Sequence, residues 1–317
     1  MMLRVAGLAA AVLFGAPMAV AQQQVVDPDF RPSVASPAYA ANGPVVAIDE
    51  AHGNFHTMGG QYRPFADLLK ADGYRAQPSA VKLAKGALAG IDVLVIANAE
   101  SGDGGPAFTA AEANALHEWV EAGGSLLLIA DHAPFGASAS ILGARFGVMM
   151  GKGWAYEPTG EGITTQLVFS RDNQRLGKHP ILEGRPGKDE GIGLVRSFTG
   201  QSLGVPRNAS VLLQLGPEAR EAPRTEDLDA ARALVAARNP AAAPNTRPAA
   251  GRAQGVAMTV GKGRVVVLGE AGMFTAQAVT FPPGSAQKDF KFGMNVDGTD
   301  DQQFALNVLH WLSGAIK

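Results

Sequence analysis

Short apolar runs that alternate with helical segments constrain the fold of this chain more than any other feature. Each run is rich in aliphatic or β-branched residues and has the length of a strand buried on both faces; the clearest are 44–48, 91–97 and 125–130. The segments that follow them are predicted to be helices: 62–72, 110–122 and 137–146. This alternation predicts a parallel sheet with helices on both faces.

A late strand and a closing helix are expected to complete the same sheet. The run 264–268 has the pattern of a buried strand, and 302–316 is amphipathic. The predicted fold class is therefore α/β, with an open, mostly parallel Rossmann-like or flavodoxin-like sheet. We expect one domain over 43–317 that carries an irregular insertion at about 151–261. Within the insertion, 218–252 is rich in Ala, Pro and Arg and predicts a surface excursion, either a lid or a disordered loop.

Two of the expected helices begin at residues suited to capping. Thr109 precedes the helix expected at 110–122, and Glu112 stands three positions later, which is the spacing of a capping box. Asp300 precedes the closing helix and is expected to be its N-cap. Both signals place helix starts within a residue or two.

The first 21 residues have the pattern of an export signal. Arg4 supplies a positive start, 5–16 is apolar, and Ala19-Val20-Ala21 has the small-x-small spacing of a cleavage site, so cleavage is expected after Ala21. Residues 22–42 are polar and rich in Pro, Ala and Ser, and are expected to form a flexible arm. No later stretch is long and apolar enough to predict a transmembrane segment. The expected location is the periplasm or the exterior.

Composition excludes several kinds of chemistry. The formal net charge of −2 gives no electrostatic reason to expect a nucleic acid partner. The chain has no cysteine, which excludes a cysteine nucleophile and a thiolate metal site. A hydrophobic content of 46% with 18% charged residues is ordinary for a globular domain large enough to do without disulfides.

Acidic and histidine side chains gather where the expected strands end. In an open parallel sheet, ligands bind beyond the carboxyl ends of the strands. Four strands deliver such residues to this rim: Asp49, Glu50, His52 and His56 after the first, Glu100 after the next, Asp131 and His132 after the third, and Glu270 after the last. Each residue alone is a weak signal, and their coincidence at one rim predicts a site.

Together with the order of the elements, four segments of the chain resemble the class I glutamine amidotransferase-like fold, in particular an exported bacterial branch of unassigned function. The segments are Asp49–Asn54, Phe108–Thr109, Trp119–Gly124 and Asp131–Pro134. The resemblance covers most of 43–151 and the last fifty or so residues. It implies an α/β fold and leaves the activity open.

The chain departs from that family where the family keeps its catalytic residues. The resemblance implies a cysteine nucleophile at the turn near Ala130, Asp131 and His132, and a late His-Glu pair where this chain has Gly269 and Glu270. Without cysteine, glutaminase chemistry is excluded. No G-x-S-x-G elbow follows a strand, so a serine does not replace the nucleophile.

The first functional hypothesis is a metal-dependent hydrolase that acts on an ester, lactone or amide. Asp49, His52, His56 and His132 are candidate ligands of a divalent ion such as Zn, Mn or Ca, and an open coordination position would activate water. The expected catalytic residues are Glu50, Asp131 and Glu270, with Glu50 or Glu270 as general base. A small-molecule substrate is expected, and no nucleotide cofactor is indicated.

The second hypothesis is a non-catalytic module of the cell envelope that binds a ligand or a protein. Its Asp and His residues would then form a hydrogen-bonded network that fixes the rim loops of a degenerate amidotransferase-like site. A third hypothesis uses Asp131 as a covalent nucleophile. The sequence does not predict the oligomeric state.

Overall fold

One large mixed sheet forms the centre of the molecule. The structure is a computed structural model that describes residues 23–40, 42–236 and 245–317. The strand order is β3-β2-β4-β5-β16-β15-β11-β6, with β12 also paired to β15. The strands are β2 (Val45–Asp49), β3 (Arg75–Ser79), β4 (Val93–Ala97), β5 (Ser125–Ile129), β6 (Met149–Met150), β11 (Leu203–Gly204), β12 (Ser210–Gln214), β15 (Ala253–Val260) and β16 (Gly263–Leu268).

The half of this sheet from β3 to β16 is parallel. Strands β3, β2, β4, β5 and β16 pair in parallel register, so their carboxyl ends meet at one rim. Every residue of β2, β4 and β5 is buried, which explains why these strands are continuous apolar runs and not alternating ones. The rim that the sequence predicts therefore exists.

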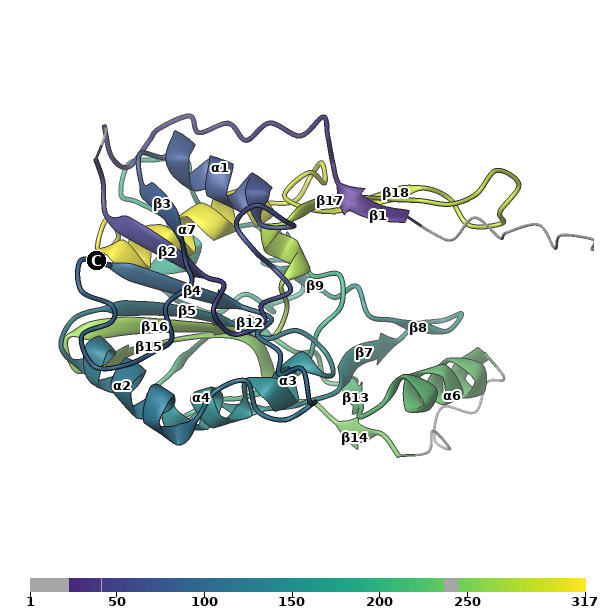
Figure 1. The fold of residues 1–317 in the computed structure, drawn as a ribbon. Helices are drawn as coiled ribbons and strands as arrows, with labels where there is room; N and C mark the ends of the chain where they lie inside the picture. Colours follow the sequence, from purple (N-terminus) through teal and green to yellow (C-terminus); the bar gives the residue numbers. More distant parts are fainter. Residues whose placement is uncertain (1–22, 41, 237–244) are drawn as a thin grey trace, which may run out of the picture.

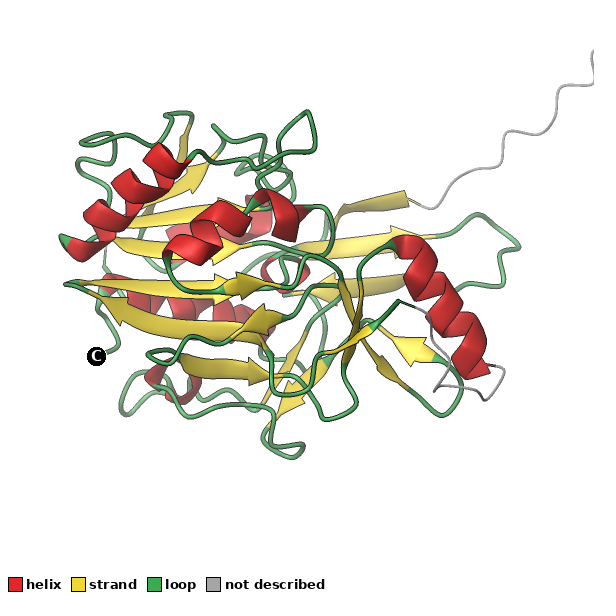
Figure 2. Ribbon diagram, turned by 90° about the horizontal axis from the view of Figure 1, so that it is seen from below, coloured by secondary structure: helices red, strands yellow, loops and turns green. Residues whose placement is uncertain are grey.

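Helices cover both faces of the sheet. Helices α1 (Arg63–Ala71) and α7 (Asp301–Ser313) bury Phe65 and Leu309 against one face. Helices α2 (Ala110–Glu121) and α4 (Ser140–Arg145) pack on the other face, where Leu116 contributes to the second core. In Figure 1, α1 and α7 lie above the sheet and α2 and α4 below it; Figure 2 shows the lower face with helices across it.

The two capping signals have different outcomes. Thr109 and Glu112 form the reciprocal capping box at the start of α2, so that prediction is confirmed. Asp300 stands at the N-cap position of α7 but makes no side-chain cap bond. Its Oδ2 instead accepts the backbone N–H groups of Gly193 and Leu194 at 2.7 and 2.8 Å. Asp300 therefore ties the insertion to the last helix.

Antiparallel elements surround the central sheet. A three-stranded ribbon joins β1 (Gln23–Val26), β17 (Ala276–Thr280) and β18 (Phe290–Gly293). Within the expected insertion, β9 (Val168–Ser170) pairs with β10 (Leu194–Arg196), and a four-stranded sheet joins β7 (Trp154–Pro158), β8 (Ile163–Thr164), β13 (Arg220–Ala222) and β14 (Arg247–Pro248). Among the residues that the structure describes, the remaining helices are α3 (Phe135–Ser138), α5 (Pro180–Glu183), α6 (Thr225–Ala236) and the 3₁₀ turn η2 (Gly272–Phe274).

The expected open, mostly parallel sheet is wrong as a description of the fold. Strands β15, β12, β11 and β6 extend the central sheet in antiparallel register, and three further sheets are antiparallel. The switch occurs where the chain reverses between β15 and β16 at Gly261, whose φ is 59°. A Cβ there would meet the Glu121 carbonyl oxygen at 2.6 Å, so this hairpin needs glycine. The molecule is a mixed α/β protein, richer in sheet than the predicted class.

Several expectations about the chain ends and the excursion remain predictions. The proposed leader lies outside the described residues. The excursion 218–252 contains all of β13, α6 and β14, and the stretch 237–244 that is not described. Among the described residues, no helix combines the length and the hydrophobicity needed to cross a bilayer.

Candidate functional site

A pocket of about 500 Å³ opens at the carboxyl ends of the parallel strands. Its polar lining comes from Gln24, His56, Asn98, Asp131, His132, Thr199, Glu270 and Gln277. Its apolar walls come mainly from Phe55, Phe135, Trp154, Phe198 and Phe292. In Figure 1, the ribbon β1–β17–β18 and the hairpin β7–β8 both lie at this end of the sheet, and each contributes lining residues.

Two buried carboxyl groups form the polar centre of the pocket. Asp131 follows β5 and Glu270 follows β16, and these neighbouring strands deliver both to one place. Asp131 is 6% exposed and Glu270 is fully buried. Burial raises the pKa of Asp131, and burial together with the nearby Asp131 charge raises the pKa of Glu270 well above its usual range. The two groups therefore act as a pair that favours holding one proton.

Backbone N–H groups fix the position of Glu270. Its Oε1 accepts the N–H of Gly272 at 2.6 Å and its Oε2 that of Met273 at 2.8 Å, at the start of η2. These bonds oppose the effect of burial on the pKa, and burial prevails. A protonated Glu270 can accept both bonds through lone pairs and keep its O–H for a ligand.

Asn98 at the end of β4 fixes the position of Asp131. Its backbone is left-handed, with φ of 50°, a conformation that Asn tolerates better than most residues. The Asn98 Oδ1 accepts the backbone N–H of Asp131 at 2.9 Å. The Oδ1 of Asp131 accepts the N–H of His132 at 2.7 Å. Asn98 also lines the pocket, so it lies within reach of a ligand.

His132 forms part of the pocket wall. Its ring stacks on Trp154 with centroids 3.4 Å apart and planes 12° from parallel. Its Nδ1 donates to the Ala133 carbonyl at 2.7 Å, and its Nε2 lies 4.0 Å from Asp131 Oδ1. With Nδ1 carrying the proton, Nε2 is the acceptor in the neutral ring.

His56 lines the pocket as a neutral side chain. It is 4% exposed and its ring lies 4.8 Å from that of Tyr62. Burial lowers the pKa of His56 to about 3, so the ring carries no charge near neutral pH. Its Nδ1 is buried and has no hydrogen-bond partner among the described residues. A ligand that donates to or accepts from His56 Nδ1 would give this buried nitrogen a hydrogen-bond partner and remove the cost of leaving it unpaired.

Asp49 and His52 lie in a separate cluster outside the pocket lining. The His52 Nδ1 lies 2.8 Å from Asp49 Oδ2, and its Nε2 lies 3.2 Å from Glu112 Oε1. The His52 ring packs against Phe108 with centroids 4.6 Å apart. The cluster joins the loop after β2 to the start of α2, so its geometry serves the fold.

Glu50 also lies outside the pocket lining. Its Oε1 accepts the backbone N–H of Met58 at 2.9 Å and so closes the loop after β2. Of the seven predicted site residues, the structure thus brings His56, Asp131, His132 and Glu270 together. It leaves Asp49, Glu50 and His52 elsewhere on the rim.

The expected metal ligands do not form one coordination group. Asp49 and His52 bind each other and Glu112, and His132 commits its Nδ1 to a backbone carbonyl. Within the part of the chain that the structure describes, no group of three or more His, Asp or Glu side chains has the arrangement to hold a metal ion. The residues present therefore do not fit the expected centre.

The sequence did not predict several residues of the pocket. Gln24, Trp154, Phe198 and Gln277 come from segments far apart in the chain, and their residue types carry no specific signal. Asn98 differs from these residues, because it directly follows a buried strand and the sequence already places it at the same rim.

No protein-family model and no curated protein matches the chain. Among solved structures, the N-terminal domain of mmIFT52 is 15% identical to it, with a TM-score of 0.56 over 85% of this chain and 97% of that chain. The chain shares the fold of that domain. At this identity the likeness concerns the fold alone.

Two further solved structures are similar at lower TM-scores. A ThuA-like protein from Bacteroides uniformis is 14% identical and scores 0.45 over 90% of this chain and 96% of its own. A GMP synthase subunit from Thermoplasma acidophilum is 9% identical and scores 0.41 over 86% of this chain and 96% of its own. None of the three bears on an exported branch or on an activity.

Proposed function

We propose that this protein is a hydrolase in which Asp131 and Glu270 act as a proton-sharing carboxyl pair on a small, uncharged substrate. The observation that carries the proposal is the burial of both carboxyl groups in the lining of one pocket, where the charge of Asp131 acts on Glu270 and the pKa of each is raised. Pairs of titratable groups that hold one proton between them are suited to acid and base roles at once. The targets are the ester, lactone or amide bonds that the sequence suggests.

The carboxyl pair accounts for hydrolysis without a protein nucleophile. Ionised Asp131 takes a proton from a water molecule, whose oxygen attacks the substrate carbonyl carbon. Protonated Glu270 donates its proton to the carbonyl oxygen, so the intermediate forms without a free oxyanion. Collapse of the intermediate expels the alcohol or amine with a proton returned by Asp131, while Glu270 recovers its own. The pair ends in its starting state.

The lining favours an uncharged substrate. Among the described residues that form the pocket there is neither Lys nor Arg, so a carboxylate or phosphate on the substrate would find no partner for its charge. The stacked pairs His132–Trp154 and Phe198–Phe292 offer flat apolar surfaces. A compact substrate with an apolar face fits this pocket.

A binding module without catalysis is the second candidate. Both carboxylate oxygens of Glu270 accept backbone N–H groups, which a protein that only binds would also need to shape η2. The two functions are separated by testing purified protein with 4-nitrophenyl esters, lactones and 4-nitroanilides. Turnover supports the hydrolase; saturable binding with no turnover supports the module.

The pH profile of the proposed hydrolase is expected to be a bell displaced to high pH. Activity needs one ionised and one protonated carboxyl, so it rises as the first proton leaves and falls as the second leaves. Both pKa values are raised, so both limbs lie above those of exposed carboxyls. Measuring kcat/KM from pH 3 to 10 checks this. In Glu270→Gln the residual activity should lose the falling limb; a falling limb kept in that variant would remove Glu270 from the acid role.

The hydrolase can also be proposed to depend on a divalent metal ion, and removing metal from the protein tests this dependence directly. Because the expected ligands are committed to other contacts, we expect activity to stay within about twofold after EDTA treatment and gel filtration, a factor worth about 0.4 kcal/mol of barrier. Metal content measured by mass spectrometry on the same samples completes the experiment. Activity that EDTA abolishes and Zn²⁺ or Mn²⁺ restores would assign the chemistry to a metal. Export to the periplasm or beyond stays a prediction.

A further inference from the structure

The N-terminal segment is bound along the domain as a strap. Residues 27–40, which we call the strap, join β1 to the stretch before β2; in Figure 1 they form the purple line across the top of the molecule. At the pocket end, the Asp27 carboxylate pairs with Lys291 Nζ at 2.7 Å. Midway, Gln302 Nε2 on α7 donates to the Ser33 carbonyl at 2.8 Å.

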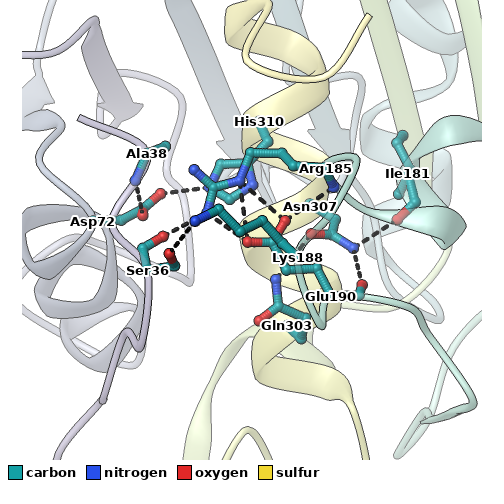
Figure 3. Close-up of polar contacts among 10 residues, drawn as sticks. All are labelled: Ser36, Ala38, Asp72, Ile181, Arg185, Lys188, Glu190, Gln303, Asn307 and His310. Carbon is teal, nitrogen blue, oxygen red and sulfur yellow. Dashed lines mark hydrogen bonds and ion pairs between the residues drawn. The ribbon is translucent and has the colours of Figure 1, made fainter.

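The far end of the strap is held by a buried polar network, shown in Figure 3. Arg185 Nη2 donates to the Ser36 carbonyl at 2.5 Å, and the same guanidinium pairs with Glu190. Asp72 Oδ1 accepts the Ala38 N–H at 2.7 Å, while its Oδ2 lies 2.7 Å from His310 Nε2. Both side chains of the Asp72–His310 pair are fully buried. Such groups are costly to leave unpaired, so they define where the strap lies.

The strap delivers Gln24 of β1 to the pocket wall. Strand β1 pairs antiparallel with β17, and Gln24 and Gln277 both line the pocket. Gln24 Nε2 donates to Gln277 Oε1 at 2.9 Å, Gln277 Nε2 to Thr275 Oγ1 at 3.0 Å, and Thr275 Oγ1 to the Gly272 carbonyl at 2.7 Å. Gly272 in turn donates to Glu270. A continuous chain of hydrogen bonds thus runs from the N-terminal strand to the turn that holds Glu270.

We propose that Gln24 contacts the substrate and determines part of the specificity, and that Arg185 is a positioning residue that holds Gln24 there through the strap. The proposal rests on the pocket being the site of the proposed function. A four-residue strand at a sheet edge gains little stability from its own ladder. The anchors on the strap therefore decide how much of the time β1 is docked.

The first test compares two adjacent glutamines. Successive side chains of a strand point to opposite faces, so Gln23 is the matched control for Gln24. Against the 4-nitrophenyl substrate with the highest turnover, Gln24→Ala should raise KM about three- to tenfold, the loss of one hydrogen bond, with kcat within about twofold. Gln23→Ala should change neither. Equal KM values in the two variants would overturn the contact.

The second test follows the docking of β1 without any substrate. In Arg185→Ala, hydrogen–deuterium exchange should accelerate in peptides covering 23–40 and 276–280, and stay unchanged over 125–129 in the central sheet. Arg232→Ala, which removes an exposed Arg–Asp pair on α6, is the control. Where the wild type turns over substrate, KM should rise in Arg185→Ala with kcat retained.

The outcomes of the two tests separate the positioning proposal from the proposed function. A wild type that hydrolyses nothing while Arg185→Ala still releases β1 refutes the hydrolase and keeps the positioning role. Exchange at 23–40 and 276–280 that matches the wild type in Arg185→Ala overturns the positioning role whatever the activity.

Discussion

Asp131→Asn is expected to lower kcat about a thousandfold with little change in KM, because the amide cannot accept the proton of the attacking water. The change is nearly isosteric and keeps an oxygen that can accept the His132 N–H now bound by Asp131 Oδ1. It also removes the negative charge that raises the pKa of Glu270, so the remaining acid should titrate at lower pH. Steady-state kinetics and pH profiles of the variant measure both effects.

Glu50→Gln is the control variant for the loss of kcat in Asp131→Asn. Glu50 is, with Glu270, one of the two carboxylates that the sequence offers as general base, and it lies on the same rim but outside the pocket lining. We expect its loss to leave kcat within about threefold, since a carboxylate must be within hydrogen-bond reach of the water it activates. An equal loss in both variants, or full activity in Asp131→Asn, would contradict the proposed pair.

Local features of the fold were predictable because short-range physics determines them. The runs at β2, β4 and β5 are buried on both faces and read as strands without knowledge of their neighbours. The capping box at Thr109 depends on residues three positions apart. Asp300 shows the limit of such reasoning, since its carboxylate found partners more than a hundred residues away.

The antiparallel extension of the sheet was not predictable in the same way. The first six residues of β15 are buried like those of the central parallel strands, and the direction of β15 follows from the tight reversal at Gly261. The short strands of the insertion pair with each other across long loops, and their sequences are too brief to show a period. Pairing over such distances depends on packing that one sequence does not reveal.

The principle that ligands bind beyond the carboxyl ends of parallel strands located the pocket, but it also predicted site residues that lie outside the pocket. Strands β5 and β16 are neighbours, so Asp131 and Glu270 meet as the order of elements implies. His52 follows β2 on the same rim, but its ring turns toward Phe108 and Glu112. This principle gives the edge of the sheet at which the residues after a strand lie, and it does not give the direction in which their side chains point. Trp154 and Gln24 reach the pocket through tertiary pairing alone.

His52→Ala is expected to destabilise the fold by about 3–5 kcal/mol, because it leaves the buried Asp49 carboxylate without its main partner. The His52 side chain is fully buried and that of Asp49 is 1% exposed. Denaturant unfolding followed by circular dichroism measures the free energy of unfolding. Lys70→Ala is the control, since its pair with Asp67 is exposed on both sides and is of the surface kind that contributes about 0–1 kcal/mol.

The same variant decides whether the Asp49–His52 cluster belongs to the chemistry. If the cluster only joins the β2 loop to α2, kcat/KM of the folded His52→Ala protein should stay within about threefold of the wild type, since no transition-state contact is lost. In the double variant Asp49→Ala/His52→Ala the two stability losses should not add, because the partners form one network. If the folded His52→Ala protein instead loses activity as Asp131→Asn does, His52 takes part in catalysis and the carboxyl pair does not act alone.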